Sequence, residues 1–428
     1  WAWGDWSGTE GYHWVGVWNE REDRKFGQYD VQAAIWDLVC WTAPYYLPFK
    51  AAGNDRSDSA PDAGTVFHYF IDEDNWGSKS YNPGADPYDD GFKNGYNTVP
   101  TFSTAKNIMT VGAVRDAVNG GMRDIGFAGM TTFSGWGPTD DGRIKPDIVA
   151  NGFGLYSARS LEDNAYGNKS GTSMAAPNAT GSALLLVEYY QQCFPGKAMR
   201  ASMLKGLIIH TADDLGEPGP DYRFGWGLMN TQAAAGHIRR HRDHPSALYM
   251  VLGVLAEAVP VRTHAFTWNG VDPIRATLCW TDPPGQAQSG LNIATPTLVH
   301  DLDLWITGPG GEVVGLPFLL NPEQPEASAT RGDNTRDNVE QVLIEQPSEP
   351  GVYTMHVSYK GALQEAEQYY ALLLSGQHPD AIPEEAALPA SRASVLLFVL
   401  GLAGALYMVR SVSYTHLRAH ETVLDLVC

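Results

Sequence analysis

The chain has 428 residues, of which 43% are hydrophobic and 11% aromatic, so it can build packed cores, and two domains are expected. Its 29 Lys and Arg against 49 Asp and Glu give a formal net charge of −20, which argues against nucleic acid as a partner and offers carboxylates to divalent cations. The four cysteines fit the spacing of neither a zinc site nor a disulfide framework, and no organic cofactor is expected.

The first clear pattern is a helix followed by a strand. Apolar residues recur at helical spacing over residues 29–42, and Pro44 ends that segment. Residues 46–52 then have the pattern of a buried strand that runs into a turn at Gly53 and Asn54. Helix and strand in this order are half of a crossover unit, so they predict a parallel sheet. Active sites of such sheets lie at the carboxyl ends of the strands, where Asn54 stands.

A long polar stretch, residues 62–101, comes next and is rich in Gly, Asn, Asp and Tyr. It is longer than a usual connection, so we expect an insertion or a lid-like loop. Asp72 and Asp74 begin a sequence like a calcium loop, but Pro83 stands where an EF-hand needs Glu. A solvated acidic loop is the default interpretation, and a structural calcium site at these two aspartates is the alternative.

Residues 171–177, GTSMAAP, lie between a polar loop and the apolar run 183–190, which predicts a loop that leads into a helix. Ser173 would then lie at a helix N-terminus, where free N–H groups and the helix dipole favour negative charge. A serine placed there can act as a nucleophile whose own N–H helps to hold an oxyanion. The alternative is that Ser170 or Thr172 only caps the helix.

The last third of the chain has a different pattern. Residues 198–212 predict another helix, and the charged residues 237–244 are interpreted as a hinge between domains. From about residue 248, short alternating runs recur between Pro- and Gly-containing turns, which predicts a β-sandwich or jelly roll. The expected strands are 264–268, 276–280, 302–306, 341–344, 352–357 and 370–374.

Two aspartates of one expected strand, Asp301 and Asp303, alternate with leucines and therefore share a face. Their charges repel each other unless a cation or hydrogen-bond donors lie between them. Calcium and an arginine partner such as Arg336 are both compatible with this pattern, and hydrogen bonding within the loop is favoured.

Four stretches in order resemble the subtilisin-like serine peptidases, or subtilases. The resemblance covers roughly residues 1–235. The stretches are 50–55 (KAAGND), 107–113 (NIMTVGA), 133–138 (FSGWGP) with 141–150 (DGRIKPDIVA), and 171–177. The resemblance implies an α/β fold, a subtilisin-like parallel sheet flanked by helices, followed by an all-β jelly-roll domain like that of some large alkaline subtilisins.

The resemblance also implies an activity, that of a serine endopeptidase that cleaves proteins or peptides. Ser173 would be the nucleophile that forms an acyl-enzyme, and the side-chain amide of Asn54 would lie in the oxyanion hole. Residues 1–4 are typical of the end of a strand, which in the family pairs with the substrate backbone; core packing of Trp3 is an equal alternative. The implied substrate-binding residues are Trp3, Gly4, Ala51, Ala52, Gly53 and Thr172.

In subtilases the catalytic Asp and His precede the Ser along the chain. Neither His13 nor His68 is followed by the Gly-Thr that marks the family's histidine, His210 comes after the nucleophile, and Asp5 is too close to the cleft strand. We therefore expect the Asp and His, with a propeptide, to lie upstream of residue 1, so the chain as given should hydrolyse little. The alternative is a non-catalytic pseudoprotease that binds peptides.

The expected division is a peptidase domain over residues 1–245, a jelly-roll domain over 246–378 and a linker over 379–392. A C-terminal apolar helix over 393–410 follows, and its 17 uncharged residues at 393–409 would span about 25 Å, so they predict a membrane anchor or sorting signal. Residues 411–428 resemble the translation of a sequencing adaptor and are left out of the fold and function. A monomer that is secreted or held at the cell envelope is expected.

Overall fold

The computed structural model describes four ranges of the chain, all within one compact unit: residues 3–5, 11–72, 75–160 and 162–379. Nearly all of the predicted linker, the predicted apolar helix and the adaptor-like segment lie outside these ranges. Within them, no helix is both long enough and apolar enough to cross a bilayer.

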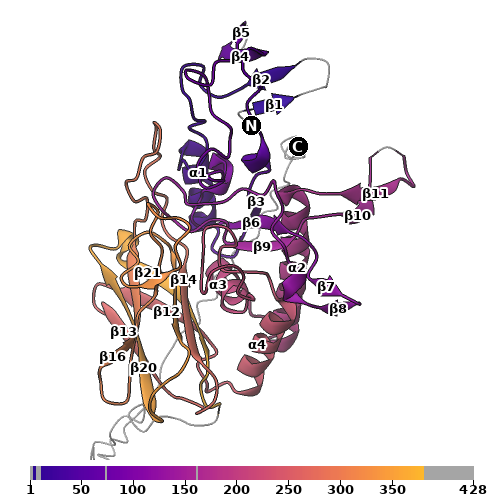
Figure 1. The fold of residues 1–428 in the computed structure, drawn as a ribbon. Helices are drawn as coiled ribbons and strands as arrows, with labels where there is room; N and C mark the ends of the chain where they lie inside the picture. Colours follow the sequence, from indigo (N-terminus) through magenta and orange to yellow (C-terminus); the bar gives the residue numbers. More distant parts are fainter. Residues whose placement is uncertain (1–2, 6–10, 73–74, 161, 380–428) are drawn as a thin grey trace, which may run out of the picture. The chain divides into compact units, whose positions relative to one another are not determined.

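A three-stranded parallel sheet lies at the centre of the N-terminal half (Figure 1). Its strands, in the order β3-β6-β9, are β3 (Phe49–Ala51), β6 (Met109–Val114) and β9 (Ile148–Asn151). Every residue of β6 is buried, as expected for a parallel strand that is covered on both faces. The long helix α2 (Thr172–Cys193) packs against all three strands. The predicted parallel sheet with flanking helices is confirmed.

Three further helices are α1 (Val31–Thr42), α3 (Ala201–His210) and α4 (Thr231–Asp243). The first two were predicted from their apolar spacing. The predicted hinge at residues 237–244 is wrong, because most of it belongs to α4. The side chain of Asn230 accepts from the Ala233 N–H and caps this helix, and Ile238 lies in the core.

The polar stretch 62–101 is predicted to be an insertion or a lid-like loop. The structure shows that it also contains a β-hairpin, which was not predicted. Strands β4 (Val66–Asp72) and β5 (Asn75–Ser80) extend a sheet whose order is β1-β2-β4-β5. The other two strands are β1 (Trp3–Asp5) and β2 (Tyr12–Trp14). The hairpin forms because aromatic side chains of these strands bury one another, among them Trp3, Trp14 and Phe67.

The remaining short elements of the described residues are 3-10 turns and two-stranded hairpins. The turns are η1 (Asp55–Ser57), η2 (Thr101–Ser103), η3 (Ile125–Phe127) and η4 (Gln364–Ala366). The hairpins are β7 (Val118–Asn119) with β8 (Met122–Arg123), β10 (Leu155–Ala158) with β11 (Tyr166–Lys169), and β17 (Phe318–Leu319) with β18 (Thr330–Arg331).

The C-terminal half is a sandwich of two four-stranded antiparallel sheets, which confirms the predicted class. One sheet has the order β12-β21-β14-β19 and the other β13-β20-β15-β16. All six predicted strands are present, and β12 and β16 were not predicted. The strands are β12 (Met250–Ala256), β13 (Val261–Thr267), β14 (Ile274–Trp280), β15 (Asp301–Thr307), β16 (Val313–Gly315), β19 (Val339–Ile344), β20 (Val352–Lys360) and β21 (Glu367–Ser375).

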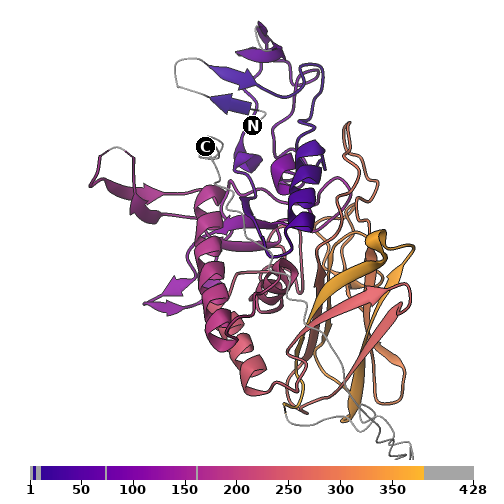
Figure 2. The ribbon, with the colours of Figure 1, turned by 180° about the vertical axis from the view of Figure 1, so that it is seen from behind.

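The two halves share one hydrophobic core, with α3 packed against β14 and β21 (Figure 2). The close approach depends on Gly206, because a Cβ atom there would lie 2.8 Å from Leu373 Cδ1 and 3.2 Å from Cys279 Cβ. Leu207 of the helix and Leu373 of the sandwich belong to the same buried cluster. The sandwich therefore completes the core of the N-terminal half.

Buried hydrogen bonds cross the same junction. Asn107 Nδ2 donates to the Asp282 carbonyl at 2.7 Å, and the Asp282 N–H donates back to Asn107 Oδ1 at 2.8 Å. Asn338 Nδ2 donates to the same Oδ1 at 3.1 Å. Beside them, Lys106 Nζ lies 3.0 Å from Asp37 Oδ2 and 3.5 Å from Asp282 Oδ2.

Replacing this asparagine is expected to loosen the junction. Asn107→Ala should lower the free energy of unfolding by roughly 3 kcal/mol, because buried groups of Asp282 and Asn338 lose partners that are worth about 1–3 kcal/mol each. Urea unfolding followed by tryptophan fluorescence measures this loss. Asn119→Ala, at an exposed hairpin position, is the matched control and should change it by less than about 0.5 kcal/mol. Equal effects of the two substitutions would contradict the assigned role of Asn107.

Two buried histidines also lie at the junction. His210 of α3 has Nδ1 2.9 Å from Thr277 Oγ1 and Nε2 2.8 Å from Ser375 Oγ. His237 of α4 has Nε2 2.8 Å from the Tyr249 carbonyl, which can only accept, so Nε2 carries the proton. Its Nδ1 is buried and has no partner. Burial lowers the pKa of His237 to about 4 and holds the pKa of His210 well below its usual value.

These lowered pKa values predict that stability falls as the solution becomes acidic. Both histidines are neutral in the folded protein, whereas in the unfolded chain they take up protons below a pKa of about 6.5. Protons therefore favour the unfolded chain from about pH 6.5 down to about pH 4 for His237. Between pH 7 and pH 4 the wild type should lose roughly 3 kcal/mol more than His237→Gln, at about 1.36 kcal/mol per pKa unit. Parallel curves for the two proteins in urea titrations at several pH values would contradict this.

Candidate active site

Asn54 and the start of α2 are 118 residues apart in the chain and meet in the structure. Asn54 lies three residues after the last residue of β3, at the carboxyl end of that parallel strand, as predicted. Its Oδ1 accepts from the Thr172 N–H at 2.8 Å and from Thr172 Oγ1 at 2.9 Å. Because a backbone N–H can only donate, the amide oxygen must face Thr172. Asn54 Nδ2 is then left as a free donor, with no partner among the described residues.

The N-terminus of α2 has no side-chain cap. The cap position is Gly171, whose N–H donates to the Gly152 carbonyl at 2.8 Å. Ser170 Oγ accepts from the Gly154 N–H instead, and Thr172 donates to Asn54. The alternative that Ser170 or Thr172 merely caps the helix is therefore wrong, and the helix dipole acts on an open end.

Ser173 lies in the first turn of α2 and is exposed. Its hydroxyl and its N–H have no hydrogen-bond partner within the part of the chain that the structure describes. The next N–H, that of Met174, is used by the Gly171 carbonyl at 2.9 Å. The Ser173 N–H and Asn54 Nδ2 are thus two free donors beside an accessible hydroxyl. Together they can hold an oxygen that becomes negative when the hydroxyl oxygen attacks a carbonyl carbon.

Among the described residues, no histidine forms a hydrogen bond with Ser173. His210 is buried at the junction with the sandwich, as described above. His13 and His68 stack on each other across β2 and β4, with ring centroids 5.1 Å apart. None of these three forms a hydrogen bond with Ser173.

The predicted substrate-binding residues are distributed over two places. Ala51, Ala52 and Gly53 lead directly into Asn54, and Gly53 adopts φ +93° with Pro100 so close that a Cβ would lie 2.8 Å from its Cδ. Thr172 is fully buried and holds Asn54.

The strand at Trp3 and Gly4 is β1, an edge strand of its sheet. Trp3 is 2% exposed, and its Nε1 donates to the Tyr88 carbonyl at 2.7 Å, so its side chain packs in the core. A role of the β1 backbone in substrate binding stays a prediction.

The predicted metal residues have other partners in the structure. Lys360 Nζ lies 3.5 Å from Asp301 Oδ2 and 2.6 Å from Asp303 Oδ1. The cation between these carboxylates is thus a lysine ammonium, whereas Arg336 donates to the Asp141 carbonyl.

In the hairpin, Asp72 Oδ1 accepts from Asn75 Nδ2 at 2.6 Å, and Asp74 lies outside the described residues. Within the described ranges, no three or more His, Cys, Asp or Glu side chains are grouped to hold a metal ion. Calcium at these aspartates would have to displace the lysine or find further ligands, and it stays a prediction.

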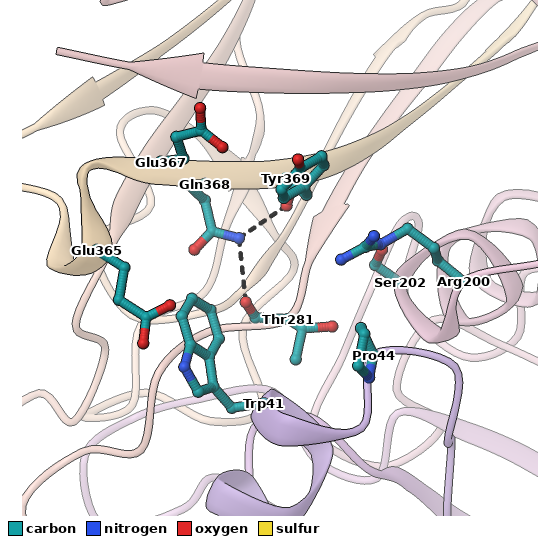
Figure 3. Close-up of a pocket in the computed structure, with 9 residues that line it drawn as sticks. All are labelled: Trp41, Pro44, Arg200, Ser202, Thr281, Glu365, Glu367, Gln368 and Tyr369. Carbon is teal, nitrogen blue, oxygen red and sulfur yellow. Dashed lines mark hydrogen bonds between the residues drawn. The ribbon is translucent and has the colours of Figure 1, made fainter. Parts of the chain in front are cut away.

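A separate pocket of about 210 Å³ lies where α1, the start of α3 and β21 meet (Figure 3). In this pocket, Gln368 Nε2 donates to the carbonyls of Thr281, at 3.1 Å, and Tyr369, at 2.7 Å. The lining residues are Trp41, Pro44, Arg200, Ser202, Thr281, Glu365, Glu367, Gln368 and Tyr369, none of which belongs to the nucleophile site. They come from four distant segments, so no sequence pattern predicted the pocket.

Comparisons with known proteins place the chain in a family. The Subtilase family model matches residues 2–227. The serine protease/ABC transporter B family protein tagA of Dictyostelium discoideum is 29% identical over 204 residues, 40% of this chain and 11% of that protein. The extracellular serine protease of Serratia marcescens is 51% identical over 69 residues, 16% of this chain and 6% of that protein. The solved CspB protease of Clostridium perfringens is 28% identical, with 34% of this chain and 29% of its own covered and a TM-score of 0.29. The chain spans only a small part of the length of these curated relatives.

Proposed function

The chain belongs to the subtilase family, and from this premise we propose that it is part of a serine endopeptidase whose nucleophile is Ser173. The observation that carries the proposal is the pair of hydrogen bonds from Thr172 to Asn54 Oδ1. They turn Asn54 Nδ2 away from Thr172, so that it and the Ser173 N–H are donors beside the exposed Ser173 hydroxyl. A surface serine with an ordinary structural role has no need of such an arrangement.

In the proposed reaction, Ser173 Oγ attacks the carbonyl carbon of the scissile peptide bond while a histidine takes its proton. The oxygen of the tetrahedral intermediate accepts hydrogen bonds from Asn54 Nδ2 and the Ser173 N–H. Collapse of the intermediate breaks the C–N bond, the histidine gives its proton to the leaving amine, and an acyl-enzyme remains until water hydrolyses it. The histidine and the aspartate that orients it come, in this proposal, from residues outside the given sequence.

The substrates in this proposal are proteins or peptides met outside the cell, and the enzyme acts as a monomer. Secretion is supported by relatives such as the extracellular serine protease of Serratia marcescens. Residues 393–409 would serve as an anchor or sorting signal, and a propeptide would precede the peptidase domain.

The experiment that tests the proposal is labelling of the full-length protein with a fluorophosphonate, which reacts only with activated serines. We expect a single adduct, mapped by mass spectrometry to the peptide that contains Ser173. A full-length protein that binds peptides but takes up no label would instead be the peptide-binding pseudoprotease.

A further inference from the structure

The pocket of Figure 3 is lined by both halves of the molecule, and we call it the junction pocket. Trp41 and Pro44 come from the end of α1 and the turn after it. Arg200 and Ser202 come from the start of α3, and the sandwich contributes the remaining residues. The volume of about 210 Å³ is below the roughly 300–1,000 Å³ of sites that take drug-sized ligands. The junction pocket therefore suits one small molecule.

One lining side chain, Gln368, is fixed by the protein itself. Its Nε2 donates to the two carbonyls named above, and its Oε1 lies 2.5 Å from His300 Nδ1. His300 Nε2 accepts from the Gln364 N–H at 2.7 Å, so Nδ1 carries the proton and donates to Gln368. Because both ends of this amide are occupied, recognition of a ligand rests on the other polar groups of the pocket.

Ser202 brings a nearly inaccessible hydroxyl to the pocket. The residue is 4% exposed, and its Oγ has no hydrogen-bond partner among the described residues. It is the second residue of α3, whose N-terminus has no side-chain cap. The Ala201 N–H donates to the Pro44 carbonyl at 2.9 Å, whereas the Ser202 N–H has no partner within the described ranges. A buried hydroxyl without a partner is costly, and the start of a helix favours a negative group, so both features point to an anionic ligand.

The cation on the same side of the pocket is the Arg200 guanidinium. Its Cζ lies 4.5 Å from the ring centroid of Tyr369 and 5.6 Å from that of Tyr45. Aromatic rings hold a guanidinium by its face and leave its N–H edge free. In the part of the chain that the structure describes, no carboxylate forms an ion pair with Arg200. The free edge can therefore donate two parallel hydrogen bonds to the carboxylate of a ligand.

The opposite side of the junction pocket is acidic and aromatic. Figure 3 shows the Glu365 carboxylate beside Trp41, whereas the carboxylate of Glu367 is turned away. Glu365 and Ala366 have φ angles of +60° and +61°, in the left-handed region that is strained for residues other than glycine. Strain of this kind persists where the surroundings hold it and is concentrated at ligand sites. A carboxylate next to an indole ring can hold an ammonium group.

We propose that the junction pocket binds a small zwitterion, either an α-amino acid or a dipeptide. The carboxylate of the ligand accepts from the Arg200 guanidinium and from Ser202 Oγ, and its ammonium pairs with Glu365. The apolar part lies against Trp41 and Pro44. A simple anion would leave Glu365 unused, and a metal ion would leave Arg200 unused, so a ligand with both charges matches the pocket best. Because both halves line the site, its occupant stabilises the assembled molecule.

The test is isothermal titration calorimetry of the full-length protein with leucine and with the dipeptide Gly-Leu. Two further compounds each lack one charge of leucine: 4-methylpentanoate has no ammonium, and 3-methylbutylamine has no carboxylate. We expect the better zwitterion to bind at least about tenfold more tightly than either of them, because each loses a charge-assisted interaction. The comparison of leucine with Gly-Leu decides between a free amino acid and a dipeptide.

Two substitutions assign the charges. Arg200→Gln should weaken binding of the zwitterion at least about tenfold. Glu365→Gln should weaken it to a similar extent and leave the affinity for 4-methylpentanoate unchanged, a pattern that a general loss of structure cannot produce. Arg240→Gln is the matched control, because this exposed guanidinium also lies over a tyrosine ring, 5.9 Å from the Tyr249 centroid, and is not among the residues that line the pocket. It should keep the wild-type affinity.

Several outcomes overturn the inference. Neither zwitterion binding at millimolar concentration would do so, as would equal affinities of the wild type, Arg200→Gln and Glu365→Gln. Sulfate or 4-methylpentanoate binding as tightly as the better zwitterion would make the pocket a plain anion site and remove the role of Glu365. None of these results bears on Ser173, because its labelling by the fluorophosphonate is a separate measurement.

Discussion

Full-length protein that carries Ser173→Ala is expected to lose its cleavage of casein by about 10⁶-fold, the loss known for the nucleophile of subtilisin itself and taken over from it. The physical reason is that Thr172, which carries the other hydroxyl beside the Asn54 amide, is buried and donates to Asn54 Oδ1, so Ser173 carries the accessible hydroxyl at the open end of α2. Release of labelled peptides from casein measures the loss. Ser170→Ala is the matched control, because its hydroxyl only accepts from the Gly154 N–H at 2.9 Å. Casein cleavage that persists in Ser173→Ala would contradict the proposed mechanism.

The second large effect is expected at Asn54. Asn54→Ala should lower kcat about 10²–10³-fold and leave KM nearly unchanged, because the amide donates to an oxygen that is negative only in the transition state. The magnitude is the one known for the oxyanion-hole asparagine of subtilisin. Steady-state kinetics on one peptide substrate separate the two constants. Asn164→Ala, an exposed amide in the loop before the nucleophile, should change neither.

Thr172→Val offers a finer version of the same test. It removes one of the two donors that fix the Asn54 oxygen and keeps the backbone N–H, so a smaller loss in kcat is expected than for Asn54→Ala. A rise in KM with unchanged kcat for either variant would instead place Asn54 in ground-state binding.

Periodicity was enough to predict the parallel sheet and six strands of the sandwich, because buried helices and half-buried strands have distinct spacings. It missed β12, whose apolar run does not alternate and contains Gly253, and β16, which has only three residues. It also missed the hairpin of β4 and β5. That hairpin is stabilised by aromatic packing with Trp3 and Trp14, far away in the sequence.

For the site, spacing placed Asn54 at a strand end and Ser173 at a helix start, but only the family resemblance brought them together. The hydrogen bonds that join Asn54 to Thr172 span 118 residues, and no local pattern encodes such a pairing. The partner of Asp301 and Asp303 shows the same limit. Lys360 reaches them because β20 pairs with β15 in a register that sets Asp301 opposite Lys360, which depends on strand order and not on spacing.

The shared core of the two halves has a consequence for the proposed protease, which would be exposed to its own activity. Only a short connector, after the end of α4 at Asp243 and before Met250, joins the halves along the backbone. If the enzyme cleaved its own chain once in this connector, the two halves would still be held together by the packing of α3 against the sandwich. The hydrogen bonds between Asn107 and Asp282 would also hold them. The molecule can thus be cut in two and stay assembled, whereas deleting the sandwich would expose the buried face of α3 and leave a peptidase half prone to aggregate.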